Sequence, residues 1–82
     1  MNERVLTLYA RRGCPLCDKM AAALTPHLAA GSMQLHTVDI DLDPELLARF
    51  DWDVPLLFEG EREICRHEFS AFAFEAWLIS FN

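Results

Sequence analysis

The sequence has few cysteines, no long apolar run and no recognisable targeting segment. Three cysteines in 82 residues cannot form a closed set of disulfide pairs, which argues against a secreted, disulfide-stabilised scaffold. No apolar run approaches the roughly 20 residues that a helix needs to cross a bilayer. The N-terminal stretch MNERVLTLYA contains no signal-peptide core or cleavage pattern. We therefore expect a cytoplasmic protein that does not associate with membranes.

Basic residues are also scarce. Seven Lys and Arg residues oppose 13 Asp and Glu residues, which leaves a formal net charge of −6. A chain of this charge repels phosphate backbones, so we expect no nucleic-acid partner. The acidic residues concentrate in one stretch that contains a single cation, Arg49: Asp39, Asp41, Asp43, Glu45, Asp51 and Asp53. This stretch predicts a solvated face, with docking of a basic partner as the alternative.

The remaining composition is typical of one globular domain. Apolar residues make up 52% of the chain and charged residues 24%, which excludes a disordered or low-complexity sequence. A chain this short buries only a little over half of its unfolded surface, so its core cannot be divided further. We therefore predict a single domain over residues 1–82, and we expect it to be a monomer.

The first half of the chain predicts two strands and two helices in alternation. Residues 5–10 (VLTLYA) alternate β-forming with smaller residues and end at the turn RRG. A helix begins at Pro15, and Pro26 is expected to kink or interrupt it. Residues 33–40 (MQLHTVDI) have the composition of a second strand. Asp43 then offers an N-cap for a short helix over the segment DPELLARF.

The second half predicts a hairpin and a last helix. Residues 54–58 (VPLLF) and 62–66 (REICR) flank a tight turn, so we expect two antiparallel strands. Ser70 introduces a helix to about Phe81 that is apolar almost all the way round. We expect this helix to pack on the sheet and on the first helix, with a partner surface as the alternative. The order β-α-β-α-β-β-α predicts an α/β fold with a four-stranded mixed sheet flanked by helices.

Cys14 and Cys17 are the candidates for chemistry. Cys14 lies between the first strand and the first helix, among unpaired backbone N–H groups at the positive end of the helix dipole. This position, together with the cations Arg11, Arg12 and Lys19, favours a thiolate, so Cys14 is the candidate nucleophile. Cys17 lies nearly one turn further along, on the buried face of the helix. It is therefore the candidate to resolve a mixed disulfide formed at Cys14.

Two stretches resemble the glutaredoxins of the thioredoxin superfamily. YARRGCPLC (residues 9–17) is similar to their active-site pattern Tyr-Ser-Lys-x-x-Cys-Pro-Tyr-Cys, and DVPLLFEGE (residues 53–61) is similar to their Val-Pro-x-x-Phe segment. The resemblance implies a thioredoxin-like fold and a thiol-disulfide oxidoreductase with a redox-active CxxC disulfide. It implies a cis peptide bond before Pro55. It also implies that the substrate site is formed by Tyr9, Arg11, Pro15, Leu16, Val54 and Pro55.

The same resemblance indicates the reaction partners. We expect a disulfide-containing protein or a small-molecule disulfide as substrate, no metal ion or tightly bound cofactor, and glutathione as a candidate reductant. The sequence departs from the glutaredoxins where Leu16 replaces a Tyr and where Cys65 and Arg66 replace a Gly-Gly pair. In the family these residues contact glutathione, so the departures predict weak use of glutathione.

Two other functions stay open at this point. Cys14, Cys17, Cys65 and His67 form a nominal Cys3His set for zinc. The second alternative is a thioredoxin-fold interaction protein that is not catalytic. Structural zinc usually stabilises chains with too small a core, whereas this chain is rich in apolar residues. Accordingly, we expect Cys65 to be a buried strand residue and Trp52 to belong to the core.

Overall fold

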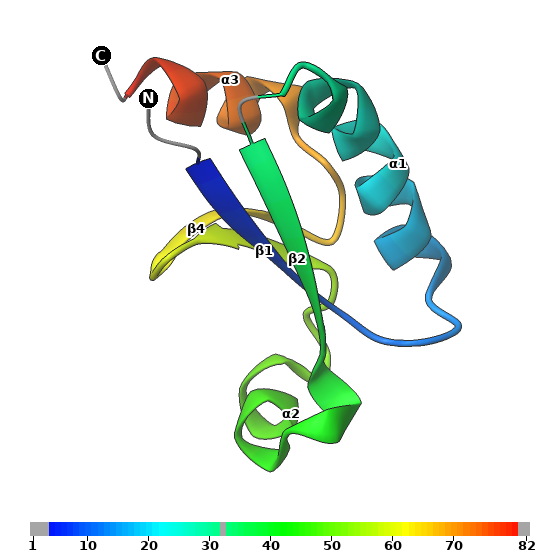
Figure 1. The fold of residues 1–82 in the computed structure, drawn as a ribbon. Helices are drawn as coiled ribbons and strands as arrows, with labels where there is room; N and C mark the ends of the chain where they lie inside the picture. Colours follow the sequence, from blue (N-terminus) through cyan, green and yellow to red (C-terminus); the bar gives the residue numbers. More distant parts are fainter. Residues whose placement is uncertain (1–3, 32, 81–82) are drawn as a thin grey trace.

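The chain forms a four-stranded mixed sheet with helices on both faces (Figure 1). The computed structural model describes residues 4–31 and 33–80. In chain order the elements are β1 (Arg4–Ala10), α1 (Pro15–Ala29), β2 (Met33–Asp39), the 3-10 helix η1 (Ile40–Leu42), α2 (Pro44–Phe50), β3 (Leu56–Glu59), β4 (Arg62–Arg66) and α3 (Ala71–Ile79). The predicted fold class and element order are confirmed, and η1 is an addition. None of the helices in the described ranges is long and apolar enough to span a membrane.

The strands are arranged in the order β2-β1-β3-β4. β1 and β2 run parallel, with Leu6 opposite Leu35, because α1 returns the chain to the same end of the sheet. β3 is antiparallel to both of its neighbours, β1 and β4. The hairpin turns at Gly60, whose φ of 57° lies in the left-handed region that glycine adopts readily. β1 is thus a central strand, and β2 and β4 are the two edges.

The core is divided by the sheet into two layers. The layer under α1 and α3 centres on Leu6, Leu8, Met20, Leu24, Phe74 and Trp77. The smaller layer under η1 and α2 consists of Ile40, Phe50, Leu56 and Phe58, with the Tyr9 ring packed against them. Since successive strand side chains point to opposite faces, β1 contributes to both layers.

Helix caps account for several of the predicted boundaries. Asp43 accepts hydrogen bonds from the backbone N–H groups of Glu45 and Leu46, as an N-cap should. Ser70 accepts one from Ala73 N–H at the start of α3. Asp39 caps η1 in the same way, through the N–H of residue 41. Asp39 and Asp43 of the acidic stretch therefore cap helices and are not solely part of a solvated face.

Pro26 does not interrupt α1, so of the predicted kink or interruption the interruption is wrong. The helix runs without a break from Pro15 to Ala29. A proline at this position leaves the carbonyl four residues earlier, at Ala22, without its usual helical donor. Ala22 is exposed, so water can reach this carbonyl and the helix tolerates the missing bond.

Two expectations about the large apolar residues need correction. Trp52 is not in the core, because 89% of its surface is exposed. α3 buries Phe74 and Trp77 but leaves Phe72 87% exposed, so it does not pack on all sides. The predicted end of this helix near Phe81 lies outside the described residues. Burial on α3 is thus limited to the face that meets the sheet and α1.

Trp77 connects α3 to the two central strands of the sheet. Its ring is 1% exposed, and its Nε1–H donates to the Glu59 carboxylate at 2.9 Å. The Arg4 guanidinium lies 3.8 Å from the ring centroid, a cation–π contact. The same guanidinium donates to the carbonyls of residues 77 and 78. The last helix is therefore joined to β1 and to β3 through one side chain.

The two tryptophans provide a matched test of this packing. Trp77→Ala removes a buried ring and its hydrogen bond, so it should lower the free energy of unfolding by about 3–5 kcal/mol. Trp52→Ala changes an exposed ring and should alter the same quantity by less than about 0.5 kcal/mol. Urea denaturation followed by far-ultraviolet circular dichroism measures both. Similar losses in the two variants would contradict the assignment of Trp77 to the core.

Candidate active site

Cys14 and Cys17 form a disulfide at the start of α1, with their Cα atoms 5.2 Å apart. β1 ends at Ala10, and the chain turns through Gly13, whose φ of 69° is easily adopted only without a side chain. Cys14 is the N-cap of α1, and Pro15 occupies the first helical position, where no backbone donor is needed. The strand, the turn and the helix start together place the dithiol at the edge of the molecule.

The two cysteines differ in exposure and in hydrogen bonding. Cys14 is partly exposed, whereas Cys17 is 4% exposed and belongs to the core beside Met20. The backbone N–H of Cys17 donates to the Cys14 sulfur at 3.1 Å. A donor in this position also stabilises negative charge on that sulfur once the disulfide is reduced. The geometry distinguishes an accessible, N–H-bonded sulfur from a buried one.

Arg11 is not a free cation beside the dithiol. Its guanidinium donates to the Asp41 carboxylate at 2.6 and 3.2 Å and forms an ion pair with Asp51 at 3.0 Å. It also donates to the backbone carbonyl of Asp51 at 3.1 Å. Hydrogen bonding to Arg11 holds the pKa of Asp41 below its usual value, and the two carboxylates raise the pKa of Arg11. Sequence reasoning missed this pairing because the partners lie 30 and 40 residues away.

Val54 and Pro55 lie immediately before β3. The peptide bond between them is cis. The Val54 side chain packs against the same core layer as Cys14 and also against the layer under α2. The Pro55 carbonyl accepts a hydrogen bond from His67 N–H at 2.7 Å. This carbonyl is therefore already used within the fold.

The loop before Val54 is held from both sides. On one side Arg11 binds Asp51, as described above. On the other side Asp53 pairs with Arg66 at 3.3 Å and with the His67 ring at 3.5 Å. Trp52 lies between these two attachments with its ring exposed. The ion pairs fix a loop whose backbone leads directly to the cis bond.

Two further candidate residues have different surroundings. The Tyr9 ring lies 5.0 Å from the ring of Phe50 and 5.4 Å from that of Phe58, in the layer under α2. It is therefore part of the packing on the sheet face opposite α1. Leu16 is 43% exposed and borders a cavity of about 140 Å³ lined by Leu16, Lys19, Met20, His67, Glu68 and Phe69.

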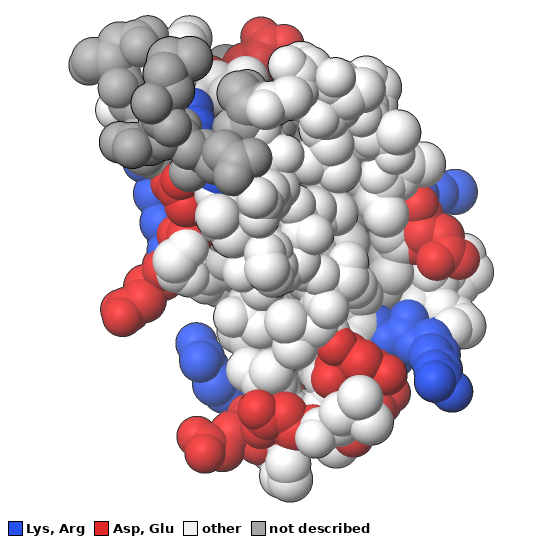
Figure 2. Space-filling model, viewed as in Figure 1, with Lys and Arg blue, Asp and Glu red and all other residues white. Residues whose placement is uncertain are grey.

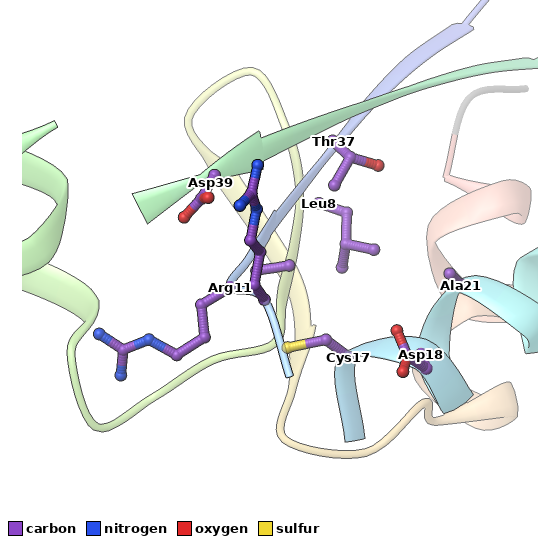
Figure 3. A pocket seen from close by; sticks show the side chains of 9 residues that line it. Leu8, Arg11, Cys17, Asp18, Ala21, Thr37 and Asp39 are labelled. Carbon is purple, nitrogen blue, oxygen red and sulfur yellow. The ribbon is translucent and has the colours of Figure 1, made fainter. Parts of the chain in front are cut away.

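A second cavity, of about 210 Å³, lies between α1 and the ends of β1 and β2 (Figure 3). Cys17 forms part of its wall on the helix side, and Leu8 and Thr37 lie on the strand side. Asp18 and Asp39 add carboxylates to its lining. The buried cysteine thus borders a cavity that also has polar groups.

The structure does not bring together the nominal zinc ligands. Cys65 is buried in β4, and burial raises the pKa of its thiol. The His67 ring is paired with Asp53 instead. Within residues 4–31 and 33–80, no three His, Cys, Asp or Glu side chains are grouped so that they could hold a metal ion. The zinc alternative is therefore not supported, and Cys65 is the buried strand residue that we expected.

Solved structures of other proteins resemble this one. Protein Ne2328 from Nitrosomonas europaea is 29% identical with a TM-score of 0.82, over 94% of this chain and 93% of that chain. Protein XcR50 from X. campestris is 37% identical with a TM-score of 0.70, over 92% and 96%. Mitochondrial thioredoxin 3 from Saccharomyces cerevisiae, in its oxidized form, is 17% identical with a TM-score of 0.65, over 98% and 80%. The last likeness supports the thioredoxin-like fold alone.

Sequence comparison places the chain in a family. No curated protein matches it. The family model described as "Glutaredoxin-like domain (DUF836)" matches residues 5–79, which include the dithiol, the cis bond and all four strands but for the first residue of β1. A thioredoxin-like fold with two cysteines at CxxC spacing indicates a redox function. The chain belongs to the glutaredoxin-like domain family.

Proposed function

We propose that this protein is a thiol-disulfide oxidoreductase whose active group is the Cys14–Cys17 pair. The observation that carries the proposal is the asymmetry of this pair at the start of α1. One sulfur is partly exposed and accepts a backbone N–H, and the other is buried. Thiol-disulfide exchange needs an accessible thiolate to attack and a second thiol held nearby to complete the reaction.

The reaction has two exchange steps. In the reduced protein, the Cys14 thiolate attacks one sulfur of the substrate disulfide, and the other substrate sulfur leaves as a thiolate that takes up a proton. Cys17 then loses its proton to water in the cavity that it borders and attacks the Cys14 sulfur. The mixed disulfide breaks and releases the second substrate thiol. Two electrons pass to the substrate, and the Cys14–Cys17 disulfide is formed.

The substrate contacts are assigned to Pro15, Leu16 and the backbone of Val54. Pro15 and Leu16 are exposed beside Cys14, and the backbone of Val54 lies at the start of β3. Val54 can offer its N–H and C=O to an extended substrate segment, as the edge of a sheet does. Pro55 shapes this segment, but its carbonyl is bonded to His67. Tyr9 and Arg11 have partners of their own, so we assign them positioning roles.

The substrate is a disulfide-containing protein or a small-molecule disulfide. A dithiol that must return to its reduced state suits a reducing compartment, in agreement with the cytoplasmic location that the cysteine content predicts. Glutathione is the candidate reductant. No resident cofactor or metal enters the reaction, because the two sulfurs supply both electrons.

The first prediction concerns the reactivity of the two thiols. In the reduced protein the pKa of Cys14 should lie below the value of about 8.5 for a free thiol, because the Cys17 N–H and the helix N-terminus stabilise its thiolate. The pKa of Cys17 should not be lowered. Alkylation rate against pH in the variants Cys17→Ser and Cys14→Ser, each with Cys65→Ala, measures them separately. A Cys14 that titrates like a free thiol would disprove the proposed activation.

The second prediction concerns the intermediate. Cys17→Ser should stop the reaction after the first exchange, so a mixed disulfide with the substrate accumulates at Cys14. Cys65→Ala should react to completion like the unmodified protein, because Cys65 is buried and is not part of the disulfide. Non-reducing electrophoresis and mass spectrometry after incubation with a model disulfide show the adduct. Adducts at Cys65, or none in Cys17→Ser, would favour the non-catalytic alternative.

The third prediction concerns glutathione. Leu16, Cys65 and Arg66 stand where glutaredoxins have the Tyr and the Gly-Gly pair that contact glutathione. Leu16 borders a cavity that Lys19, His67 and Glu68 also line. We expect turnover of glutathione mixed disulfides to be at least tenfold slower than in a glutaredoxin with the usual motif, while exchange with other disulfides stays measurable. Coupled assays with both substrate types test this. Fast turnover with glutathione that is lost in Glu68→Gln would overturn this expectation.

A further inference from the structure

The charged residues are absent from one long part of the chain. Residues 20–38 contain no Asp, Glu, Lys or Arg, although the protein has 20 such residues. This segment covers most of α1 and nearly all of β2. Figure 2 shows the result as a broad uncharged face, with Lys, Arg, Asp and Glu side chains gathered along its borders. In a protein with a net charge of −6, this face is a surface that a second copy can approach without like-charge repulsion.

The two edges of the sheet differ in how they are protected. Proteins commonly block an edge strand with charged side chains or with a bulge, because its unpaired N–H and C=O groups attract other strands. β4 has both features, with Arg62, Glu63 and Arg66 on the strand and a register shift in its pairing with β3. β2 carries no charge before its last residue, Asp39, and its register with β1 is unbroken. Among the described strands, β2 has no neighbour on its outer side.

We propose that β2 pairs with β2 of a second copy of this chain, in an antiparallel arrangement that joins the two sheets. The arrangement is isologous, since the same edge is used by both copies and a two-fold axis perpendicular to the sheet relates them. This dimer replaces the monomer that the sequence predicts. It does not depend on the proposed redox function.

The ends of β2 are compatible with this pairing. In an antiparallel pair centred on His36, the two copies of Asp39 lie at opposite ends, about 20 Å apart at the usual rise of a strand. That separation exceeds the Debye length of about 8 Å at physiological ionic strength, so their repulsion is screened. His36 itself is exposed and lies at the middle of the seven-residue strand. The centre of the proposed interface thus contains no Asp, Glu, Lys or Arg side chain.

α1 takes part in the same interface. Stable interfaces bury about 1,200 Å² or more in total, which exceeds what a single strand edge supplies. The two-fold axis places the α1 helices of both copies on the same side of the joined sheet. Ala21 of α1 and Thr37 of β2 line the same cavity between the helix and the strand, and the next turns of the helix carry Thr25 and Ala29. These small, uncharged side chains allow the two helices to approach.

The proposed dimer leaves the segment before β3 accessible. β2 flanks β1 on one side, and β3 flanks it on the other. Val54 and Pro55 precede β3, so this part of the proposed substrate site lies on the side of β1 that faces away from the interface. The cavity that Cys17 borders is also lined by Ala21 of α1 and by Thr37 and Asp39 of β2, so dimer formation is measured directly and not through disulfide exchange.

Sedimentation equilibrium of the full chain tests the proposal. The unmodified protein and His36→Gln should be dimers, whereas His36→Glu, which sets two like charges opposite each other, should raise the dissociation constant at least tenfold. Ala71→Glu adds the same charge at an exposed position of α3 and should remain dimeric. A monomeric unmodified protein overturns the proposal, and so does a His36→Glu variant that dimerises as well as His36→Gln.

Two further measurements test the fold of the variant and the surface that the dimer uses. Circular dichroism of His36→Glu should match that of the unmodified protein, because the changed side chain is exposed. Amide hydrogen exchange of β2 in the unmodified protein should become faster on dilution, as the outer edge loses its partner. A dimer whose β2 amides exchange equally fast at all concentrations uses another surface and refutes the proposal.

Discussion

The fold depends on the burial of β1 on both faces of the sheet. Leu6 and Leu8 fill the layer under α1 and α3, while Tyr9 packs into the layer under α2. The two-residue period of a strand makes this division unavoidable once β1 is central. The same strand ends immediately before the turn that carries Cys14. A change that displaced β1 would therefore disturb both core layers and the position of the dithiol together.

Arg11 extends this constraint to the segments around the site. It joins the end of β1 to Asp41 in η1 and to Asp51 in the loop before β3. Exposed ion pairs contribute little stability individually, because water screens them and their side chains lose freedom. The ion pairs of Arg11 instead orient the chain, since they hold the loop that leads to Val54 against the turn that leads to Cys14. The acidic stretch thus supplies helix caps and ion-pair partners as well as solvated charge.

The sequence predicted those features that depend on local chemistry. Caps such as Asp43 and Ser70, and Pro15 at a first helical position, act within one turn, so their roles follow from residue type and spacing. The predictions that Trp52 is buried and that Pro26 breaks α1 were wrong. Both outcomes depend on which segments meet in space. Aromatic side chains are buried on average, but a single one such as Trp52 can be exposed. The exposure of Ala22 lets α1 tolerate Pro26.

The dithiol shows the same division between local and distant causes. The spacing of the two cysteines and their place at a helix start could be predicted from the sequence. The pairing of the Arg11 charge with two distant carboxylates could not. Because Arg12 and Lys19 are exposed, solvent and ions screen their effect on Cys14. The Cys17 N–H and the other backbone N–H groups at the start of α1 act at contact distance and are not screened in this way. Stabilisation of a Cys14 thiolate therefore rests on the backbone geometry of the helix start more than on the basic side chains around it.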